Sequence, residues 1–419
     1  MTAPDTRVRG RLALGALACL ACLVGAAGAW RALRPAWQAP PPTAANAAEE
    51  RMQDFRDALY FPIREFLDGG NPYHPAVMFA HWPVRQSFNL YQPYHLVLHL
   101  PFALPDYRVG AVAFALASLV LLVLLAVLAA GRLRPHVPLA VGTAVVAALL
   151  VLSQVGKAQL YVGQVNPLIA VGAAGALLWR DRHPRWAAPA LALAWLKPQF
   201  GLPLALLLFA RGSRRVALTG TAVAAAASLA VVAPLVSRGG SGAFLDSIAA
   251  NLAHAGQTPY GAVDSMTAQR VDIAAVFFRL TGWAPPGAEV VALVGALAVS
   301  AVLVRRLDRA GAPAAADLLT CLAVVVAVVH QPGDVLIAAP ALVAVAAVWW
   351  PRRRVRAWRP VGVALLLVAV PFAHLHFVGL AVRDALGARA DVTLDGVALV
   401  LAWALLAAFA AGVARGRTP

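Results

Sequence analysis

The sequence predicts an all-α protein that crosses a membrane many times. Hydrophobic residues make up 61% of its 419 residues and charged residues only 13%, about half the usual share in soluble domains. A soluble chain of this length cannot cover so much apolar surface with so few charges. Apolar runs near the length that spans a bilayer, about 20 residues, recur along the whole chain. These observations exclude a cytosolic enzyme, a disordered regulator and a fibrous protein.

The apolar runs predict a transmembrane helical bundle of about 12 membrane helices, two of them short, in a single membrane domain over residues 1–419. The first run, Leu12 to Trp30, is longer than a typical signal-peptide core, which favours an uncleaved helix. Lys197-Pro198 interrupts the run 187–210, which we expect to form two short helices that meet there. The remaining runs lie near residues 109–130, 137–156, 165–180, 216–236, 287–305, 314–329, 334–350, 360–378 and 393–413.

The charges divide unequally between the two sides that these spans define. With a cytoplasmic N-terminus, the cytoplasmic segments hold 21 of the 35 Lys and Arg residues and 4 of the 19 Asp and Glu residues. This bias is the positive-inside rule, so the net charge of +16 indicates membrane topology and not nucleic-acid binding. Both termini are expected to be cytoplasmic, together with residues 131–136, 180–186, 211–215, 305–317 and 351–359.

Two long polar segments, 34–108 and 237–286, are then the first and second extracytoplasmic loops. In the first loop, the pattern from Asp54 to Leu67 predicts an amphipathic helix lying at the membrane interface, bent or interrupted by Pro62. We expect residues 88–104 to form a second interfacial helix. The apolar face of the first helix holds Phe55, Ala58, Leu59, Ile63 and Phe66, with Arg56, Asp57, Arg64 and Glu65 elsewhere.

Polar residues near the hydrocarbon are costly, so their positions point to function. Under this topology they converge on the outer side, as one catalytic cavity requires. Each also has a structural alternative, such as helix capping for Asp54, Gln164 and Asn166, snorkelling to lipid phosphate for Lys197, or a solvated loop for His330 and Asp334. The converging residues are Asp54, Gln164, Asn166, Lys197, Asp264, Ser265, Arg270, His330, Asp334, His374 and His376.

The sequence favours neither a metal nor a nucleotide cofactor. His95 and His99 have the i, i+4 spacing of a metal pair, but no Glu follows in the H-E-x-x-H manner. Asp54 and Asp57 are three residues apart and are a weak alternative cation site. Phosphate-binding loops of the G-x-x-x-x-G-K-[ST] and G-x-G-x-x-G types are absent from the sequence. An activated group used on the outer side would have to arrive on a lipid carrier.

Three stretches resemble a known family. They are Asp54-Phe55 with Phe66-Leu67-Asp68-Gly69-Gly70-Asn71-Pro72-Tyr73, then Tyr91-Gln92-Pro93 with Leu100-Pro101, and then Gly163-Gln164-Val165-Asn166 with Trp195-Leu196-Lys197-Pro198. Together they resemble polyprenyl-phosphate-sugar-dependent GT-C glycosyltransferases, and in particular glycosyltransferase family 87. The resemblance covers roughly residues 10–350.

The resemblance implies a GT-C fold and a hexosyltransferase of the bacterial plasma membrane, with its active site on the extracytoplasmic side. A sugar, expected to be mannose, would move with inversion from a polyprenyl-phosphate donor to a glycolipid or glycan acceptor, without a metal. Asp54 would be the general base, and Lys197, His330 and Arg270 would stabilise the leaving phosphate. Gln164 and Asn166 would contact the donor, and Tyr73, Asp264 and Asp334 would line the sugar or acceptor pocket.

Two other classes of protein remain as alternatives. A transporter or lipid flippase would normally place ionisable residues at mid-membrane and often shows symmetric halves. In this sequence the polar groups lie at one rim, and no repeat is visible. An inactive structural subunit would tolerate the substitution Asp54→Asn without loss of function.

Overall fold

The structure is a computed structural model that describes residues 4–87, 89–267 and 270–413. Its residues are 78% helical, with no strand in the described ranges, which confirms the predicted all-α class. Two expectations lie outside the described part, those for the basic tail 414–419 and for the side chain of His376.

Six helical segments of the described chain are long and apolar enough to cross a membrane, or eight if two bent pairs each count as one span. The predicted count of about 12 is therefore not confirmed. The six are α1 (Pro4–Gln38), α6 (Tyr107–Ala130), α12 (Arg214–Gly239), α15 (Ala288–Arg309), the run of η4 (Pro332–Ala338) into α17 (Ala339–Trp349), and α21 (Leu394–Val413).

Helix length explains the difference. Four predicted spans form α9 (Asn166–Trp179), α10 (Pro184–Ala194), α11 (Pro198–Ala210) and α16 (Pro313–Ala327), which have 11 to 15 residues. At 1.5 Å per residue, such helices reach about 20 Å, which is less than the hydrocarbon core of about 30 Å. α16 is buried along almost its whole length, so its apolar residues mark the centre of the bundle rather than a surface facing lipid.

The two bent pairs also shorten the predicted spans. α7 (Leu139–Leu152) and α8 (Gln154–Val162) meet at an angle of 64°, at Ser153. The Ser153 hydroxyl caps α8 by accepting a hydrogen bond from the Gly156 amide. In the second pair, α18 (Arg359–Ala369) and its 3₁₀ extension precede α19 (His376–Leu386) across a bend of 101°.

The predicted break at Lys197-Pro198 is confirmed. α10 (Pro184–Ala194) ends just before it, and α11 begins at Pro198. A residue before proline is pushed out of the helical region, and Lys197 is accordingly extended, at φ −111° and ψ 112°. The break leaves the Lys197 side chain on a turn, where it can face a cavity.

Residues 34–108, called the first outer loop after the predicted topology, fold into short helices. The helix predicted from Asp54 to Leu67 changes from π-helical to α-helical near Pro62. A π-helical segment, η2 (Phe55–Tyr60), is followed by α2 (Phe61–Leu67), with Pro62 in the first turn of α2. The single interfacial helix expected over 88–104 is two short ones joined at His99. The remaining helices of the loop are α3 (Pro75–His81), α4 (His95–Leu98) and α5 (Leu100–Ala103).

Three of the four charged residues that were expected off the apolar face of the first interfacial helix are buried, namely Arg56, Asp57 and Glu65. Arg56 and Asp57 form an ion pair, with 2.6 Å between Arg56 Nε and Asp57 Oδ1. Glu65 accepts a hydrogen bond from the Trp82 indole at 2.8 Å. These charges are buried because the following part of the loop folds back over η2 and α2, where Trp82 contacts Glu65 and Gln86 contacts Asp57.

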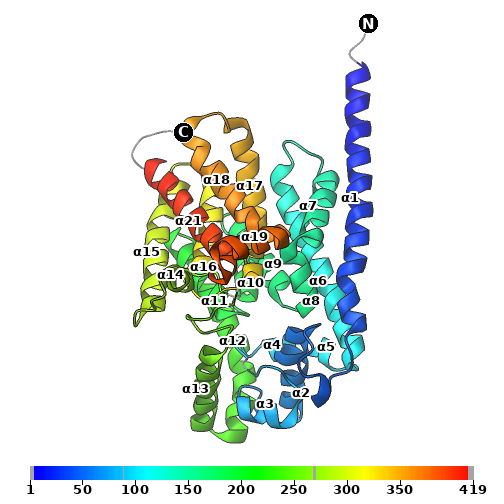
Figure 1. Cartoon of the computed structure of the whole chain (residues 1–419), viewed down its shortest axis with the longest axis vertical. Coiled ribbons are helices and arrows are strands. Elements are labelled where there is room, and N and C mark those ends of the chain that lie inside the picture. Colours follow the sequence, from blue (N-terminus) through cyan, green and yellow to red (C-terminus); the bar gives the residue numbers. More distant parts are fainter. Residues whose placement is uncertain (1–3, 88, 268–269, 414–419) are drawn as a thin grey trace.

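The two outer loops contact each other. The second loop contributes α13 (Ser241–Gln257) and α14 (Ile273–Thr281). The Asn251 side chain of α13 bonds both backbone groups of Asn89 in the first loop, accepting from the amide and donating to the carbonyl. In Figure 1 the helices α2 to α5 and α13 lie at the lower end, whereas the start of α1, the end of α21 and the connection from α17 to α18 lie at the upper end.

Candidate active site

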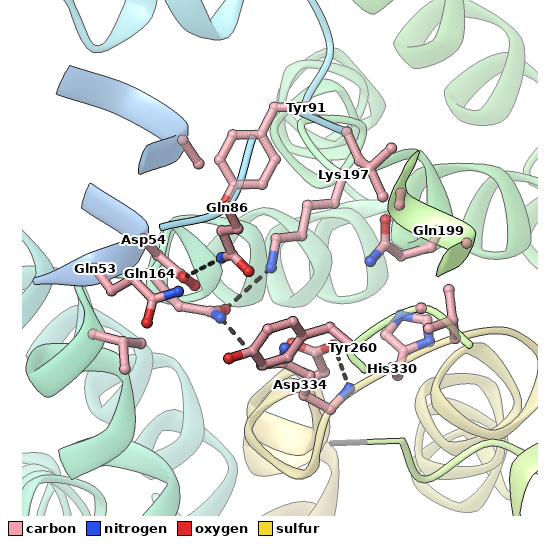
Figure 2. A pocket seen from close by; sticks show the side chains of 18 of the residues that line it. Gln53, Asp54, Gln86, Tyr91, Gln164, Lys197, Gln199, Tyr260, His330 and Asp334 are labelled. Carbon is pink, nitrogen blue, oxygen red and sulfur yellow. Dashed lines mark hydrogen bonds between the residues drawn. The ribbon is translucent and has the colours of Figure 1, made fainter. Parts of the chain in front are cut away.

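A polar cavity of about 330 Å³ lies between the first outer loop and the helical bundle. Its walls come from far-apart stretches of the chain: the start of η2, the turn between α8 and α9, the break before α11, the end of α13 and the turn after α16 (Figure 2). The polar side chains that line it are Glu50, Gln53, Asp54, Gln86, Tyr91, Gln164, Lys197, Gln199, Tyr260, His330, Gln331 and Asp334.

Asp54 lies immediately before η2 and faces this cavity. Its carboxylate accepts a hydrogen bond from the Gln86 amide nitrogen at 3.4 Å. Burial raises the pKa of Asp54 to about 6, and the negative charges of Asp57 and Asp334 also raise it, while the positive charge of Lys197 opposes them. A carboxyl group with this pKa can accept a proton near neutral pH and can release it again.

Gly163 brings the turn between α8 and α9 up against Asp54. Its φ of +75° is left-handed, and a Cβ at this position would lie 2.6 Å from the Cβ of Phe55. Only glycine satisfies both conditions. The backbone amide of Met52 also donates to the carbonyl of Tyr161 at 2.7 Å. The close approach places Gln164, the next residue, beside the carboxylate of Asp54.

Lys197 is buried on the wall of the cavity, with 7% of its surface exposed. Its ammonium donates to Asn166 Oδ1 at 2.9 Å and to Gln164 Oε1 at 3.1 Å. It also lies 5.5 Å from the centre of the Tyr91 ring, in a cation–π contact. A lysine ammonium has three N–H groups, so these bonds leave one of them for a ligand.

Asp334 fixes the orientation of this network without touching Lys197. Its carboxylate accepts from Asn166 Nδ2 at 2.7 Å and from the Gln331 backbone amide at 2.9 Å. Because a carboxylate only accepts, the Asn166 amide must turn its oxygen toward Lys197. Gln164 donates to the Gln331 side chain at 3.2 Å and completes the network.

His330 is also buried on the wall of the cavity, and its geometry departs from the cationic role that was predicted for it. Its Nδ1 lies 2.9 Å from the Val328 carbonyl, which can only accept, so we assign the proton to Nδ1. Burial lowers the pKa of His330, which favours the neutral ring. Nε2 is then an acceptor, and it is buried without a hydrogen-bond partner among the described residues.

Four predicted site residues are not among those that line the cavity. One of them, Asn166, borders it through its hydrogen bond to Lys197. Arg270 is paired with Asp272 and Glu289, at 2.8 Å and 2.7 Å, which commits its guanidinium to the second outer loop. Tyr73 is buried and donates to the Tyr91 carbonyl, so it supports the wall from behind. Asp264 is exposed in the second outer loop. The predicted topology put these residues on the outer side, but it carried no information on the direction of their side chains.

The alternative metal pair does not fit its surroundings. His95 uses both ring nitrogens, with the Gln92 carbonyl at 2.9 Å and the Asn89 side chain at 3.1 Å. His374, also expected near the site, instead lies next to Lys157 and the Leu152 carbonyl. Within the described residues, no group of three or more His, Cys, Asp or Glu side chains is arranged to hold a metal ion.

Several residues that line the cavity had not been predicted. Gln86 and Gln53 come from the first outer loop, Gln199 from the first turn of α11 and Tyr260 from the turn after α13. Isolated glutamines in loops carry no motif. The one usable signal was proximity in sequence, because Gln199 lies two residues after Lys197 and Gln53 directly precedes Asp54.

The fold and this cavity fit a multi-pass membrane protein with a site lined by acidic and basic side chains, next to the segments 34–108 and 237–286. The model of glycosyltransferase family 87 matches residues 89–332, which is more than half of the chain. The chain therefore belongs to glycosyltransferase family 87 and is a membrane glycosyltransferase. The searches of curated proteins and of solved structures gave no match.

Proposed function

We propose that this protein moves a sugar, expected to be mannose, from a polyprenyl-phosphate donor to a hydroxyl group of a glycolipid or glycan. The reaction takes place on the extracytoplasmic side of a bacterial plasma membrane and inverts the anomeric centre. Family membership supports sugar transfer, and the cavity supplies groups suited to both halves of the reaction.

In the proposed step, the acceptor oxygen attacks the anomeric carbon from the face opposite the phosphate. The bond from that carbon to the phosphate oxygen breaks, and polyprenyl phosphate leaves with the bonding electrons. Asp54 accepts the proton of the acceptor hydroxyl as the new bond forms. A general base works best when its pKa is near the working pH, and burial gives Asp54 a pKa of about 6.

Lys197 is proposed to bind the phosphate of the donor. The leaving phosphate gains negative charge, which a preorganised cation in a water-poor site stabilises. Lys197 is buried, has one uncommitted N–H group and is held in place by two amide oxygens. Asn166 and Gln164 thus act through Lys197, and Asp334 sets the orientation of Asn166.

The position of the cavity favours a lipid-linked donor. It lies next to the outer loops, away from the basic connections that are expected to face the cytoplasm, where nucleotide sugars are made. An apolar helical bundle directly beside the cavity can accommodate a polyprenyl chain. We propose that no cofactor and no divalent metal take part, since Lys197 supplies the positive charge.

The observation that carries this proposal is that Asp54 and Lys197 share one cavity although they are far apart in sequence. The test is incubation of the purified protein with polyprenyl-phosphate sugars and membrane lipids, with products detected by mass spectrometry. Wild-type protein should form a glycosylated lipid or glycan, and a folded Asp54→Ala variant should form almost none. Wild-type turnover by Asp54→Ala would rule out the assigned base.

A further inference from the structure

Gln86 makes a contact to Asp54 that family membership does not explain. It lies in the loop between α3 and α4 and lines the cavity. Figure 2 shows its side-chain amide turned toward Asp54, and the donor–acceptor distance from Nε2 to Oδ1 is 3.4 Å. This contact is between the proposed base and a neutral amide.

The charge of Asp54 fixes which way the Gln86 amide points. An ionised carboxylate can only accept hydrogen bonds, so the NH₂ group must face it. The carbonyl oxygen, Oε1, then points away from Asp54. It is buried and has no hydrogen-bond partner among the described residues. A buried acceptor left unpaired costs free energy, which a ligand that donates a hydrogen bond would recover.

The backbone that carries Gln86 is anchored independently of its side chain. The Asp57 carboxylate accepts from the backbone amides of Arg85 and Gln86, at 3.2 Å and 3.3 Å. Arg56 in turn pairs with both oxygens of Asp57 and donates to the Ala47 carbonyl. Every link in this chain is a direct contact, so the backbone of Gln86 is held in place before any ligand arrives.

We propose that Gln86 is a specificity residue, whose Oε1 accepts a hydrogen bond from a sugar hydroxyl of a substrate while its NH₂ group holds the base. This inference rests on the proposed transfer reaction and deepens it. The hydroxyl belongs either to the sugar of the donor or to the acceptor glycan. Both have the same hydrogen-bonding chemistry, and kinetics can distinguish them.

Two variants separate the two functions of the amide. Gln86→Met keeps the length of the side chain but removes both polar groups. We expect it to raise KM about tenfold or more for one substrate, because a site built to bind a hydroxyl loses that partner. The substrate whose KM rises identifies the source of the hydroxyl. Gln86→Glu keeps an acceptor oxygen, so its KM values should stay within about twofold of wild type.

The pH dependence supplies the second measurement. Lys197, Asp57 and Asp334 are the charged groups that act on Asp54. Both variants remove the amide donor, and Gln86→Glu adds a negative charge. The acidic limb of kcat/KM should therefore move to higher pH in both, and further in Gln86→Glu. Gln154, exposed at the start of α8, provides the control variant Gln154→Met, which should change neither quantity.

Unchanged KM values for both substrates in folded Gln86→Met protein would overturn the inference, even with wild-type transfer intact. If wild-type protein transfers no sugar, the proposed function fails by itself. The inference is then judged by saturation-transfer NMR with methyl α-D-mannopyranoside. A contact signal present in wild type and weakened in Gln86→Met supports it. Equal signals in both proteins, or no signal in wild type, contradict it.

Discussion

Two clusters of buried charged residues lie in different parts of this bundle, and they are built differently. The first joins the ends of α9, α11, α15 and α16 through Arg180, Arg211, Asp308 and Asp317. Arg211 contacts Asp308 at 2.7 Å and Asp317 at 2.8 Å, and Arg180 contacts Asp317 at 2.9 Å. Every charge in this cluster touches an opposite charge.

The second cluster, called the cavity cluster, consists of Asp54, Lys197 and Asp334. Among the described residues these three charges bond neutral groups and form no direct ion pair. Lys197 is bonded to amide oxygens, and Asp54 to an amide nitrogen. Asp334 is connected to Lys197 through Asn166 and makes no direct contact with it. Buried charges are normally paired closely because desolvation is expensive, so charges kept apart around a cavity indicate a site prepared for a ligand. The first cluster stabilises the fold, and the second is available for chemistry.

Breaking the paired cluster should have the largest effect on stability. Asp317→Ala leaves two buried arginines with one carboxylate fewer, which we expect to lower the free energy of unfolding by about 3 kcal/mol. Chemical unfolding in mixed micelles measures this, and kcat of the folded fraction should stay near wild type. The control is Asp181→Ala, which removes an exposed partner of Arg180 and should cost less than about 1 kcal/mol. Equal losses in the two variants would contradict the assigned role.

A substitution in the cavity cluster should affect substrate binding instead of stability. Lys197→Gln keeps a hydrogen-bonding side chain but removes the charge, so KM for the lipid-linked donor should rise by about tenfold or more. KM for the acceptor should change much less. Lys157, the other lysine of the chain, contacts His374 outside the cavity, and Lys157→Gln is the matched control. An unchanged donor KM in Lys197→Gln would count against the phosphate site.

The smallest effect is expected from metal removal. Since Lys197 is proposed to supply the positive charge that a divalent ion supplies in other enzymes, EDTA should leave the transfer rate unchanged. The assay compares initial rates before and after chelation. Loss of activity, followed by recovery with a single divalent cation, would show that the cluster lacks a charge that it needs.

The part of the fold that follows from local chemistry could be predicted. Proline after Lys197 forces a break, and glycine at 163 allows a close turn, so the motifs around both residues lie where the sequence placed them. Span number could not be predicted, because burial inside the bundle and exposure to lipid both select apolar residues. α16 is the clearest case.

The candidate site was predicted unevenly for a related reason. Six of the predicted residues line or border one cavity: Asp54, Gln164, Asn166, Lys197, His330 and Asp334. Arg270 does not line the cavity, because its guanidinium is paired with Asp272 and Glu289. No signal in the sequence marked these two residues as its partners. Gln86 was missed because its importance comes from contact with Asp54, 32 residues away in sequence.

The pH dependence of sugar transfer tests most directly whether Asp54, in the cavity cluster, is the general base. The account predicts that kcat/KM of wild-type protein rises with pH through an apparent pKa of about 6, since the carboxyl group must lose its proton before it can act. In Lys197→Gln the limb should move to higher pH, because a nearby positive charge has been removed. A wild-type limb near pH 4, or one that Lys197→Gln leaves in place, would contradict the account.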